Sequence, residues 1–239
     1  MKHKLLLCTI VVIVSFMQYQ CAPSLRSAKI QPGFSVDGVA LGTVFSASAT
    51  NEDGSKEQTE TQLDNPVPLD VKFRYGWERK ENFGFELTGG LDGQMGVYVE
   101  FPGSDAFHWG LGAETNLWVL SFAGSFDEDE DNVGSFLRDH NFNAYIMAGY
   151  IPSPKFELSV GVKYQPFLKS LIDAIPEDEL NIDTGGALPL SYLLDSRYMF
   201  SEHLGIMLGG EIFHLTVTGV GSSEVSTTGG YIYLGLTYR

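Results

Sequence analysis

The sequence has 239 residues, of which 44% are hydrophobic and only 19% are charged, and its formal net charge is −15. This length suits one sizeable domain or two small ones, and the low charged fraction argues against a disordered chain. The acidity argues against a nucleic-acid-binding protein, because that class needs a basic surface to neutralise phosphates. Both cysteines, Cys8 and Cys21, lie near the N-terminus. The body of the chain therefore has neither a disulfide framework nor a cysteine-based metal site.

The first 21 residues are typical of an export signal. A short basic start, residues 1–4, precedes thirteen mostly apolar residues, 5–17. A membrane-spanning helix needs about 20 apolar residues, whereas the core of a signal peptide needs about 7–15. Cys21 follows at the distance where a bacterial lipoprotein signal, which this segment resembles, places its acylated cysteine. The three residues before Cys21, 18–20, depart from the usual pattern. We expect lipid attachment at Cys21; an ordinary exported protein with a free or removed Cys21 is the alternative.

The rest of the chain alternates apolar and polar residues with the period of a β-strand. In residues 69–78 the odd-numbered positions are all apolar and the even-numbered ones are charged or glycine. Side chains alternate faces along a strand, so this pattern predicts strands with one apolar face. A tilted strand crosses a bilayer with about 9–11 residues, and most of the segments are near that length. We predict ten strands, with eight as the alternative count, over residues 35–48, 67–78, 83–92, 94–101, 107–124, 142–151, 155–166, 187–200, 203–217 and 229–239.

The expected connections alternate in length. Short turns over 79–82, 102–106, 152–154 and 201–202 alternate with long polar loops over 49–66, 125–141, 167–186 and 218–228, and only the single residue 93 breaks the alternation. Short turns at one end and long loops at the other are typical of bacterial outer-membrane β-barrels. An even number of strands also places both termini at the short-turn end. We therefore expect an all-β, closed antiparallel transmembrane barrel over 34–239, after a signal peptide over 1–21 and a periplasmic tether over 22–33.

Two features favour an outward apolar face over a lipocalin-like soluble barrel, which would turn that face inward. The first is a set of aromatic residues near strand ends, as in the girdles at membrane interfaces. The second is glycine on the polar face, where a narrow lumen needs small residues beside large ones. The aromatic residues are Tyr75, Trp77, Phe83, Tyr150, Phe156, Tyr164, Tyr198, Phe200 and Tyr238.

The terminal run YIYLGLTYR, residues 231–239, resembles the C-terminal strand signal of outer-membrane proteins, with Arg239 in place of the usual aromatic residue. The resemblance implies the barrel-assembly machinery as a partner, and outer-membrane lipid and lipopolysaccharide as surroundings.

With the apolar face outward, the polar face lines a narrow lumen, where charges must pair or hold water. We expect a lumen ionic network of Lys72, Arg74, Glu86, Glu100, Glu114, Glu157, Lys163, Asp195, Arg197 and Glu211, with Asp70, Glu78 and Arg239 on the same face. The network predicts a rigid plug of ion pairs; a polar conduit for small solutes is the alternative.

No motif in the chain predicts a metal site, a cofactor or an enzyme. Asp127, Asp129 and Asp131 match the first positions of a calcium-binding EF-hand, but Asn132 and Arg138 stand where glycine and glutamate are required. His108, His140, His203 and His214 lack the spacing of zinc ligands. We expect His108 to face the lumen, with Glu114 near it in sequence.

His214, Thr216 and Glu224 resemble the histidine, serine and carboxylate of outer-membrane lipid A deacylases, although threonine replaces the serine. The resemblance would imply a lipid-modifying hydrolase, a distant alternative. The ten-strand outer-membrane proteases need clustered Asp and His at the barrel rim, and the sequence does not place such a cluster.

The negative charge is concentrated in the four long loops, with net charges of −4 for residues 49–66, −5 for 125–141, −4 for 167–186 and −1 for 218–228. The barrel itself is therefore nearly balanced and carries an acidic fringe at one end. We expect divalent cations to bridge this fringe to anionic lipopolysaccharide. The function that these features favour is non-enzymatic, in envelope structure or surface interaction; a narrow channel or small-solute transporter is the alternative.

Overall fold

The structure is a computed structural model, and it describes residues 27–50, 56–58, 62–80, 83–117, 142–165, 190–218 and 224–239. In these ranges no helix is long and apolar enough to cross a membrane. The elements are strands β1 (Gly33–Thr50), β2 (Lys56–Gln58), β3 (Gln62–Lys80), β4 (Phe83–Gly90), β5 (Gln94–Pro102), β6 (Phe107–Asn116), β7 (Phe142–Ser153), β8 (Phe156–Tyr164), β9 (Leu190–Met199), β10 (Leu204–Thr218) and β11 (Glu224–Tyr238).

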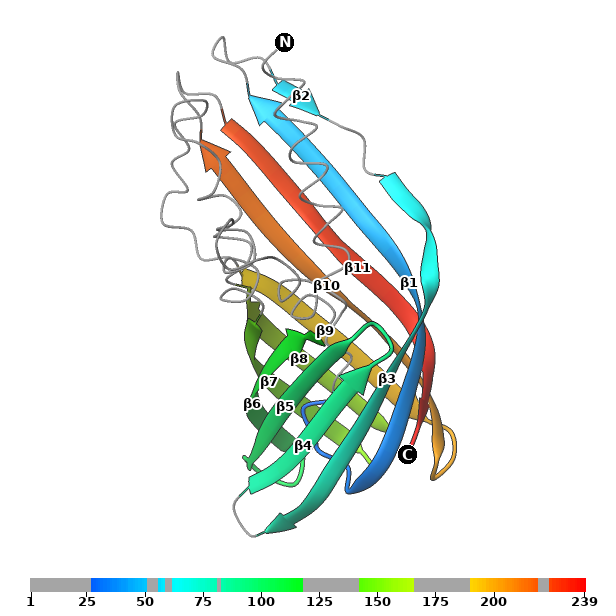
Figure 1. Cartoon of the computed structure of the whole chain (residues 1–239). Coiled ribbons are helices and arrows are strands. Elements are labelled where there is room, and N and C mark those ends of the chain that lie inside the picture. The colour runs from blue at the N-terminus through cyan, green and yellow to red at the C-terminus, as the bar shows by residue number, and fades with distance from the viewer. Residues whose placement is uncertain are drawn as a thin grey trace, which may run out of the picture.

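The strands form a closed antiparallel barrel (Figure 1). Each strand from β3 to β11 pairs with the next along the chain, β1 pairs with β3, and β11 returns to β1. The closing β1–β11 ladder runs from Val36↔Tyr238 to Thr50↔Glu224. The short β2 pairs only with the far end of β1 and lies outside the ring. Ten strands therefore close the barrel, which confirms the predicted fold class and strand count.

The ten predicted segments each correspond to one strand of the ring, but some predicted boundaries are wrong. Much of the loop expected over 49–66 is strand, since β1 continues to Thr50 and β3 begins at Gln62. The loop expected over 218–228 is likewise shortened by β11, which begins at Glu224. These polar residues pair through their backbones, which a pattern of side-chain polarity does not detect. Residues 118–124 of the expected fifth strand lie outside the described residues.

Strand length varies around the ring. β1 and β3 have 18 and 19 residues and β10 and β11 have 15 each, whereas β4 has 8 and β5 has 9. Because the long strands are neighbours, one side of the barrel rises above the other at the loop end (Figure 1). The opposite end, here the turn end, carries the short connections 103–106, 154–155 and 200–203.

The outward face of the barrel is apolar all the way round. Every strand of the ring contributes at least one large hydrophobic side chain that is more than a third exposed, including Phe34 on β1, Leu87 on β4, Ile146 on β7 and Leu234 on β11. A soluble monomer rarely exposes an apolar area this continuous. The closed ring satisfies its own backbone hydrogen bonds, as a bilayer requires. The chain is therefore an outer-membrane β-barrel, and the lipocalin-like alternative is wrong.

Aromatic side chains gather on the outward face at the turn end. The rings of Tyr75 and Trp77 lie 4.9 Å apart, and those of Phe107 and Tyr150 lie 5.4 Å apart. Tyr198, Phe200 and Tyr238 are also about half exposed there. Such a girdle marks a membrane interface, and short turns mark the periplasmic side of an outer-membrane barrel. The turn end is therefore periplasmic.

We predict that Leu194→Arg, in the middle of β9 on the outward face, lowers the free energy of unfolding by about 2–4 kcal/mol, because it places a charge in the hydrocarbon region. Leu194 is 50% exposed in the structure. Urea unfolding of the barrel in lipid vesicles measures the effect, with Leu194→Met as the control. An equal cost for the arginine and methionine variants would contradict a lipid-facing position.

Candidate functional site: the barrel lumen

All ten residues of the expected lumen network lie on the inward face of the barrel, and each is at most 6% exposed. They are Lys72, Arg74, Glu86, Glu100, Glu114, Glu157, Lys163, Asp195, Arg197 and Glu211. Asp70 is 7% exposed on the same face. Arg239 is half-buried. The placement follows from the two-residue period of each strand, since a closed barrel turns alternate residues inward.

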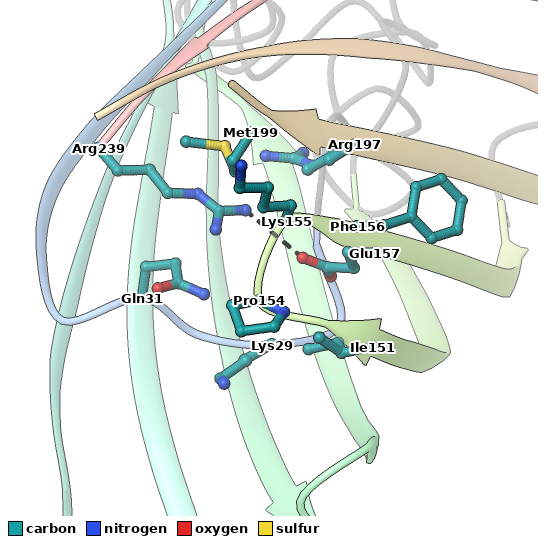
Figure 2. Close-up of a pocket in the computed structure, with 10 residues that line it drawn as sticks. All are labelled: Lys29, Gln31, Ile151, Pro154, Lys155, Phe156, Glu157, Arg197, Met199 and Arg239. Carbon is teal, nitrogen blue, oxygen red and sulfur yellow. Dashed lines mark hydrogen bonds and ion pairs between the residues drawn. The ribbon is translucent and has the colours of Figure 1, made fainter. Parts of the chain in front are cut away.

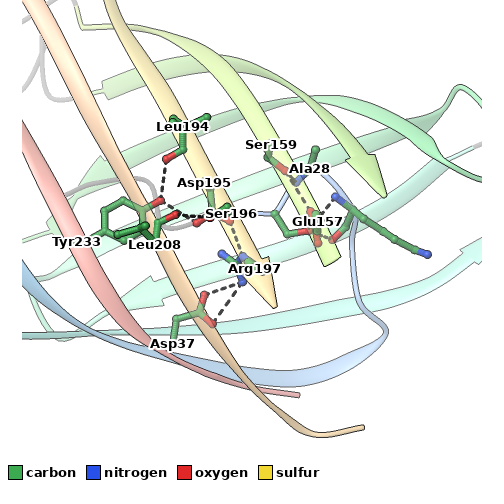
Figure 3. A network of polar contacts seen from close by, with 12 residues as sticks. Ala28, Asp37, Glu157, Ser159, Leu194, Asp195, Ser196, Arg197, Leu208 and Tyr233 are labelled. Atoms are coloured by element: carbon green, nitrogen blue, oxygen red, sulfur yellow. Dashed lines mark hydrogen bonds and ion pairs between the residues drawn. The ribbon is translucent and has the colours of Figure 1, made fainter. Parts of the chain in front are cut away.

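Asp37 joins two arginines near the turn end of the lumen, and Figure 3 shows its contact with one of them, Arg197. Its carboxylate lies 2.7 Å from Nη2 of Arg74 and 3.2 Å from Nη1 of Arg197. Nε of Arg197 donates to Asp195 at 2.7 Å, and the Tyr233 hydroxyl donates to the same carboxylate at 2.7 Å. The negative charges of two carboxylates thus balance the positive charges of two guanidinium groups. Buried charges need such partners, because they have lost their contact with water. The sequence analysis missed Asp37, although its position in β1 has the inward parity.

A second ionic cluster lies toward the loop end. Nζ of Lys163 lies 2.8 Å from Glu211 and 3.5 Å from Glu114. Gln165 and Ser191 both donate to the other oxygen of Glu211, at 2.8 and 2.6 Å. Three donors therefore hold the Glu211 carboxylate: Lys163 of β8, Gln165 directly after β8, and Ser191 of β9.

A third cluster surrounds Lys72. Its Nζ contacts Asp92 at 2.5 Å, Gln94 at 2.7 Å and Asp70 at 3.5 Å. Asp92 belongs to the turn between β4 and β5, so a connection folds back over the lumen here. This turn is short, and its Gly93 has a φ of 83°, a left-handed conformation that favours glycine. The sequence analysis noted the short connection but missed Asp92 as a partner of Lys72.

Aromatic and apolar side chains fill the space between the clusters. Tyr98 and Tyr145 stack with their ring centroids 6.1 Å apart, and Tyr233 packs with Met207, Val39 and Leu41. Glycines on neighbouring strands leave room for these rings. A Cβ atom at Gly112 would overlap the ring of Tyr145, and one at Gly209 would overlap that of Tyr233. The glycines that the sequence analysis assigned to a narrow lumen thus match large inward side chains.

The six described residues before β1 also lie inside the barrel. Residues 27–32 turn within its periplasmic end (Figure 1), and we call this segment the strap. The amide of Ala28 donates to Ser159 at 3.1 Å, and its carbonyl accepts from the Tyr98 hydroxyl at 3.0 Å. The amide of Ile30 donates to Glu100 at 2.7 Å. The hydroxyl of Ser27 donates to Glu157. The strap therefore forms hydrogen bonds with β5 and with β8.

Wall glycines make room for the strap. A Cβ atom at Gly76 on β3 would overlap the carbonyl oxygen of Gln31, and one at Gly149 on β7 would lie 2.7 Å from the Cβ of Ala28. Ala28 and Ile30 are 0% and 6% exposed. They pack with Tyr98, Tyr145, Met147 and Leu193. The strap is thus continuous with the apolar filling of the lumen. The sequence predicted a tether over 22–33. Residues 27–32 of it lie in the lumen, Gly33 begins β1, and residues 22–26 lie outside the described residues.

His108 faces the lumen, as expected, but its partner is Glu100. Nδ1 of His108 lies 2.6 Å from Glu100 Oε1, while the other oxygen of Glu100 binds the strap. Glu114, which is near His108 in sequence, lies toward the loop end, beside Lys163. His203 is exposed in the β9–β10 turn and contacts the carbonyl oxygen of Arg239 at 3.0 Å.

Several sequence predictions fall on residues that the structure does not describe. These are the export signal with Cys21, the acidic run 127–131, His140, and most of the long loops. His214 and Thr216 lie in the described backbone of β10, opposite Thr228 and Ser226, but their side chains are not described. Within the described part of the chain, no three His, Cys, Asp or Glu side chains are grouped so that they could hold a metal ion.

The comparisons with known proteins show no family for this chain. No protein-family model and no curated protein sequence matches the chain. Among solved structures, the outer membrane protease OmpT of Escherichia coli is 9% identical, with 89% of this chain and 99% of that chain covered and a TM-score of 0.34. An outer membrane channel of Pseudomonas putida F1 is 11% identical, with 91% and 98% covered and a TM-score of 0.41. The attachment invasion locus protein Ail of Yersinia pestis is 12% identical, with 87% and 99% covered and a TM-score of 0.28. These three proteins differ in function, and their similarity to this chain is too low to indicate a function for it.

We predict that Asp37→Asn lowers the free energy of unfolding by about 3 kcal/mol, because it leaves two buried arginines with less compensating charge. Urea unfolding in lipid vesicles measures this loss. The double variant Asp37→Asn/Arg74→Met should recover part of it, since the uncompensated charge is removed. A double variant less stable than Asp37→Asn would contradict the proposed coupling between Asp37 and Arg74.

We predict that Gly76→Ala displaces the strap while the barrel stays folded, because the added methyl group overlaps the Gln31 backbone. Hydrogen exchange at the amides of Ala28 and Ile30 should accelerate at least roughly tenfold, since these amides lose their buried acceptors. Gly38→Ala is the matched control, because a Cβ atom at Gly38 would have no neighbour within 4 Å. Unchanged exchange in Gly76→Ala would contradict a seated strap.

Proposed function

We propose that this protein is a closed, non-conducting outer-membrane barrel that acts in envelope structure or surface interaction through its extracellular loops. The observation that carries the proposal is the filled lumen. The strap and the cluster around Asp37 lie toward the periplasmic end, the cluster around Lys163 lies toward the loop end, and tyrosines and apolar side chains pack between them.

The pairing of charges supports a structural role for the network. A conduit for solutes needs polar groups that face water, whereas Asp37, Lys163 and Arg197 are each at most 1% exposed. Buried charges with several partners hold neighbouring strands in register and are costly to separate. The side chains inside this barrel thus have the character of a protein core rather than of a water-filled pore.

The location of charge along the chain supports the loops as the working surface. Residues 125–141 carry six acidic residues and one arginine, and residues 167–186 carry five acidic residues and one lysine. In an outer-membrane barrel the long loops face outward. Acidic loops beside anionic lipopolysaccharide favour divalent cations as bridging partners, and they leave the barrel as the scaffold that presents them. No observation on the chain supports catalysis, and we propose a non-enzymatic role.

A narrow channel that opens when the strap leaves is the second candidate. The strap favours it, because four hydrogen bonds from the strap or to it end on lumen side chains, those of Tyr98, Glu100, Glu157 and Ser159. Loss of these bonds would uncover polar groups in the wall. This candidate shares the closed resting state with the first and differs only in whether an open state forms.

Planar bilayer recording tests the proposal. We predict no steady conductance for the full chain at moderate voltage, because the strap packs against Tyr98 and Tyr145 inside the lumen. Deletion of residues 27–32 should leave the barrel closed by Tyr98, Tyr145 and Asp37. Gly76→Ala serves as a second variant that displaces the strap without shortening the chain. Ion conductance in the full chain would overturn the closed scaffold, and conductance only in the two strap variants would favour the gated channel.

A further inference from the structure

A pocket of about 150 Å³ opens at the periplasmic end of the barrel, beside the strap (Figure 2). It is formed by the strap, the β7–β8 turn, the ends of β8 and β9, and Arg239 after β11. A water molecule takes about 30 Å³ in the liquid, so this space is sufficient for a few waters or one small polar group. The pocket lies on the periplasmic side of the filled lumen and is separate from the extracellular loops.

The pocket is strongly basic in an otherwise acidic chain. Lys29 of the strap, Lys155 of the β7–β8 turn, Arg197 of β9 and Arg239 all line it, and Glu157 is the one acidic residue among the lining side chains described. Glu157 is already engaged, since it lies 3.4 Å from Arg239 and accepts from Ser27 and Ser159. The positive charge of these four side chains therefore exceeds the negative charge of the residues that line the pocket.

Two of these cations have N–H groups without an acceptor. Nε and Nη1 of Arg197 are paired with Asp195 and Asp37, but its buried Nη2 has no hydrogen-bond partner among the described residues. Nε of Arg239 is also buried without an acceptor. Figure 2 shows both guanidinium groups among the side chains that line the pocket. Buried donors are nearly always satisfied, so two buried donors without an acceptor, on residues that line one pocket, indicate a ligand that accepts hydrogen bonds.

Burial disfavours the charge on one of these side chains. Arg239 follows the last residue of β11, and desolvation, together with the neighbouring Arg197, lowers the pKa of its guanidinium below the usual value. A negative charge in the pocket would offset both effects, because it would interact favourably with the two guanidinium groups and the two lysines.

We propose that this pocket binds a phosphate group, carried either by the headgroup of an anionic phospholipid in the inner leaflet or by a small periplasmic phosphate. The cations approach from four different segments of the chain, an arrangement that suits a tetrahedral anion better than a planar carboxylate. The guanidinium forks supply directed donors, and the lysines supply point charges. Because Lys29 belongs to the strap, a bound phosphate would also hold the strap in its seat.

Isothermal titration calorimetry of the folded full chain in zwitterionic detergent, with inorganic phosphate and glycerol 1-phosphate as probes, tests the site. We predict saturable binding that Lys155→Gln and Arg239→Gln each weaken roughly tenfold, the loss expected for one charge-assisted hydrogen bond. Arg239→Lys should lie between, because it keeps the charge without the fork. Glu202→Gln is the control, since Glu202 is exposed in the nearby β9–β10 turn and does not line the pocket.

A second arm distinguishes the two sources of phosphate. The full chain is placed in phosphatidylcholine nanodiscs containing phosphatidylglycerol, and the lipids that remain bound are counted by native mass spectrometry. Bound phosphatidylglycerol that glycerol 1-phosphate displaces, and that Lys155→Gln loses, supports a lipid headgroup. Phosphate binding without retained phosphatidylglycerol supports a soluble phosphate. Absence of saturable phosphate binding, or equal affinity in the wild type and Lys155→Gln, would overturn the proposal. Lys155 is exposed in a turn, so its variant tests the site without endangering the fold.

Discussion

The closing ladder between β1 and β11 is the interaction on which the rest of this structure depends. Hydrocarbon offers no partner to a backbone N–H or C=O group, so a sheet can enter a bilayer only when it has no free edge. The pairing from Val36↔Tyr238 to Thr50↔Glu224 removes both edges at once. Once the ring is closed, alternate residues of every strand must face lipid and the others must face one another across a narrow interior. The apolar belt and the charged lumen are therefore two consequences of one constraint.

The interior has too little room for water and too many charges to be left unpaired. Its solution is local compensation, as in the group of Asp37, Arg74, Arg197 and Asp195. Between such groups, glycine on one strand leaves room for a tyrosine ring from another, and buried apolar side chains fill the space around these rings. The strap completes this packing through its backbone. Its amides donate to a wall hydroxyl and a wall carboxylate, and one of its carbonyls accepts from a wall tyrosine. A β-barrel of this size is thus stabilised from inside as well as by its ladders.

Charge is divided between the two ends of the molecule. The long loops carry most of the excess negative charge, whereas the periplasmic pocket gathers Lys29, Lys155, Arg197 and Arg239. The net charge of −15 therefore does not describe any one surface of the protein. We propose that both ends meet anionic neighbours: the acidic loops meet lipopolysaccharide through bridging cations, and the basic pocket binds phosphate directly.

The sequence alone was sufficient for the ring of ten strands, for the face that meets lipid and for ten inward charged residues, because a two-residue period is local and a closed barrel converts it directly into inside and outside. It could not show that His108 pairs with Glu100 rather than Glu114, or that Asp37 joins Arg74 to Arg197, since those partners come from strands far apart in the chain. Nor could it show the strap, whose irregular residues 27–32 have no periodicity. The seat of the strap is built by Gly76, Glu100 and Ser159 from three different strands, and only closure of the barrel brings these residues around one point.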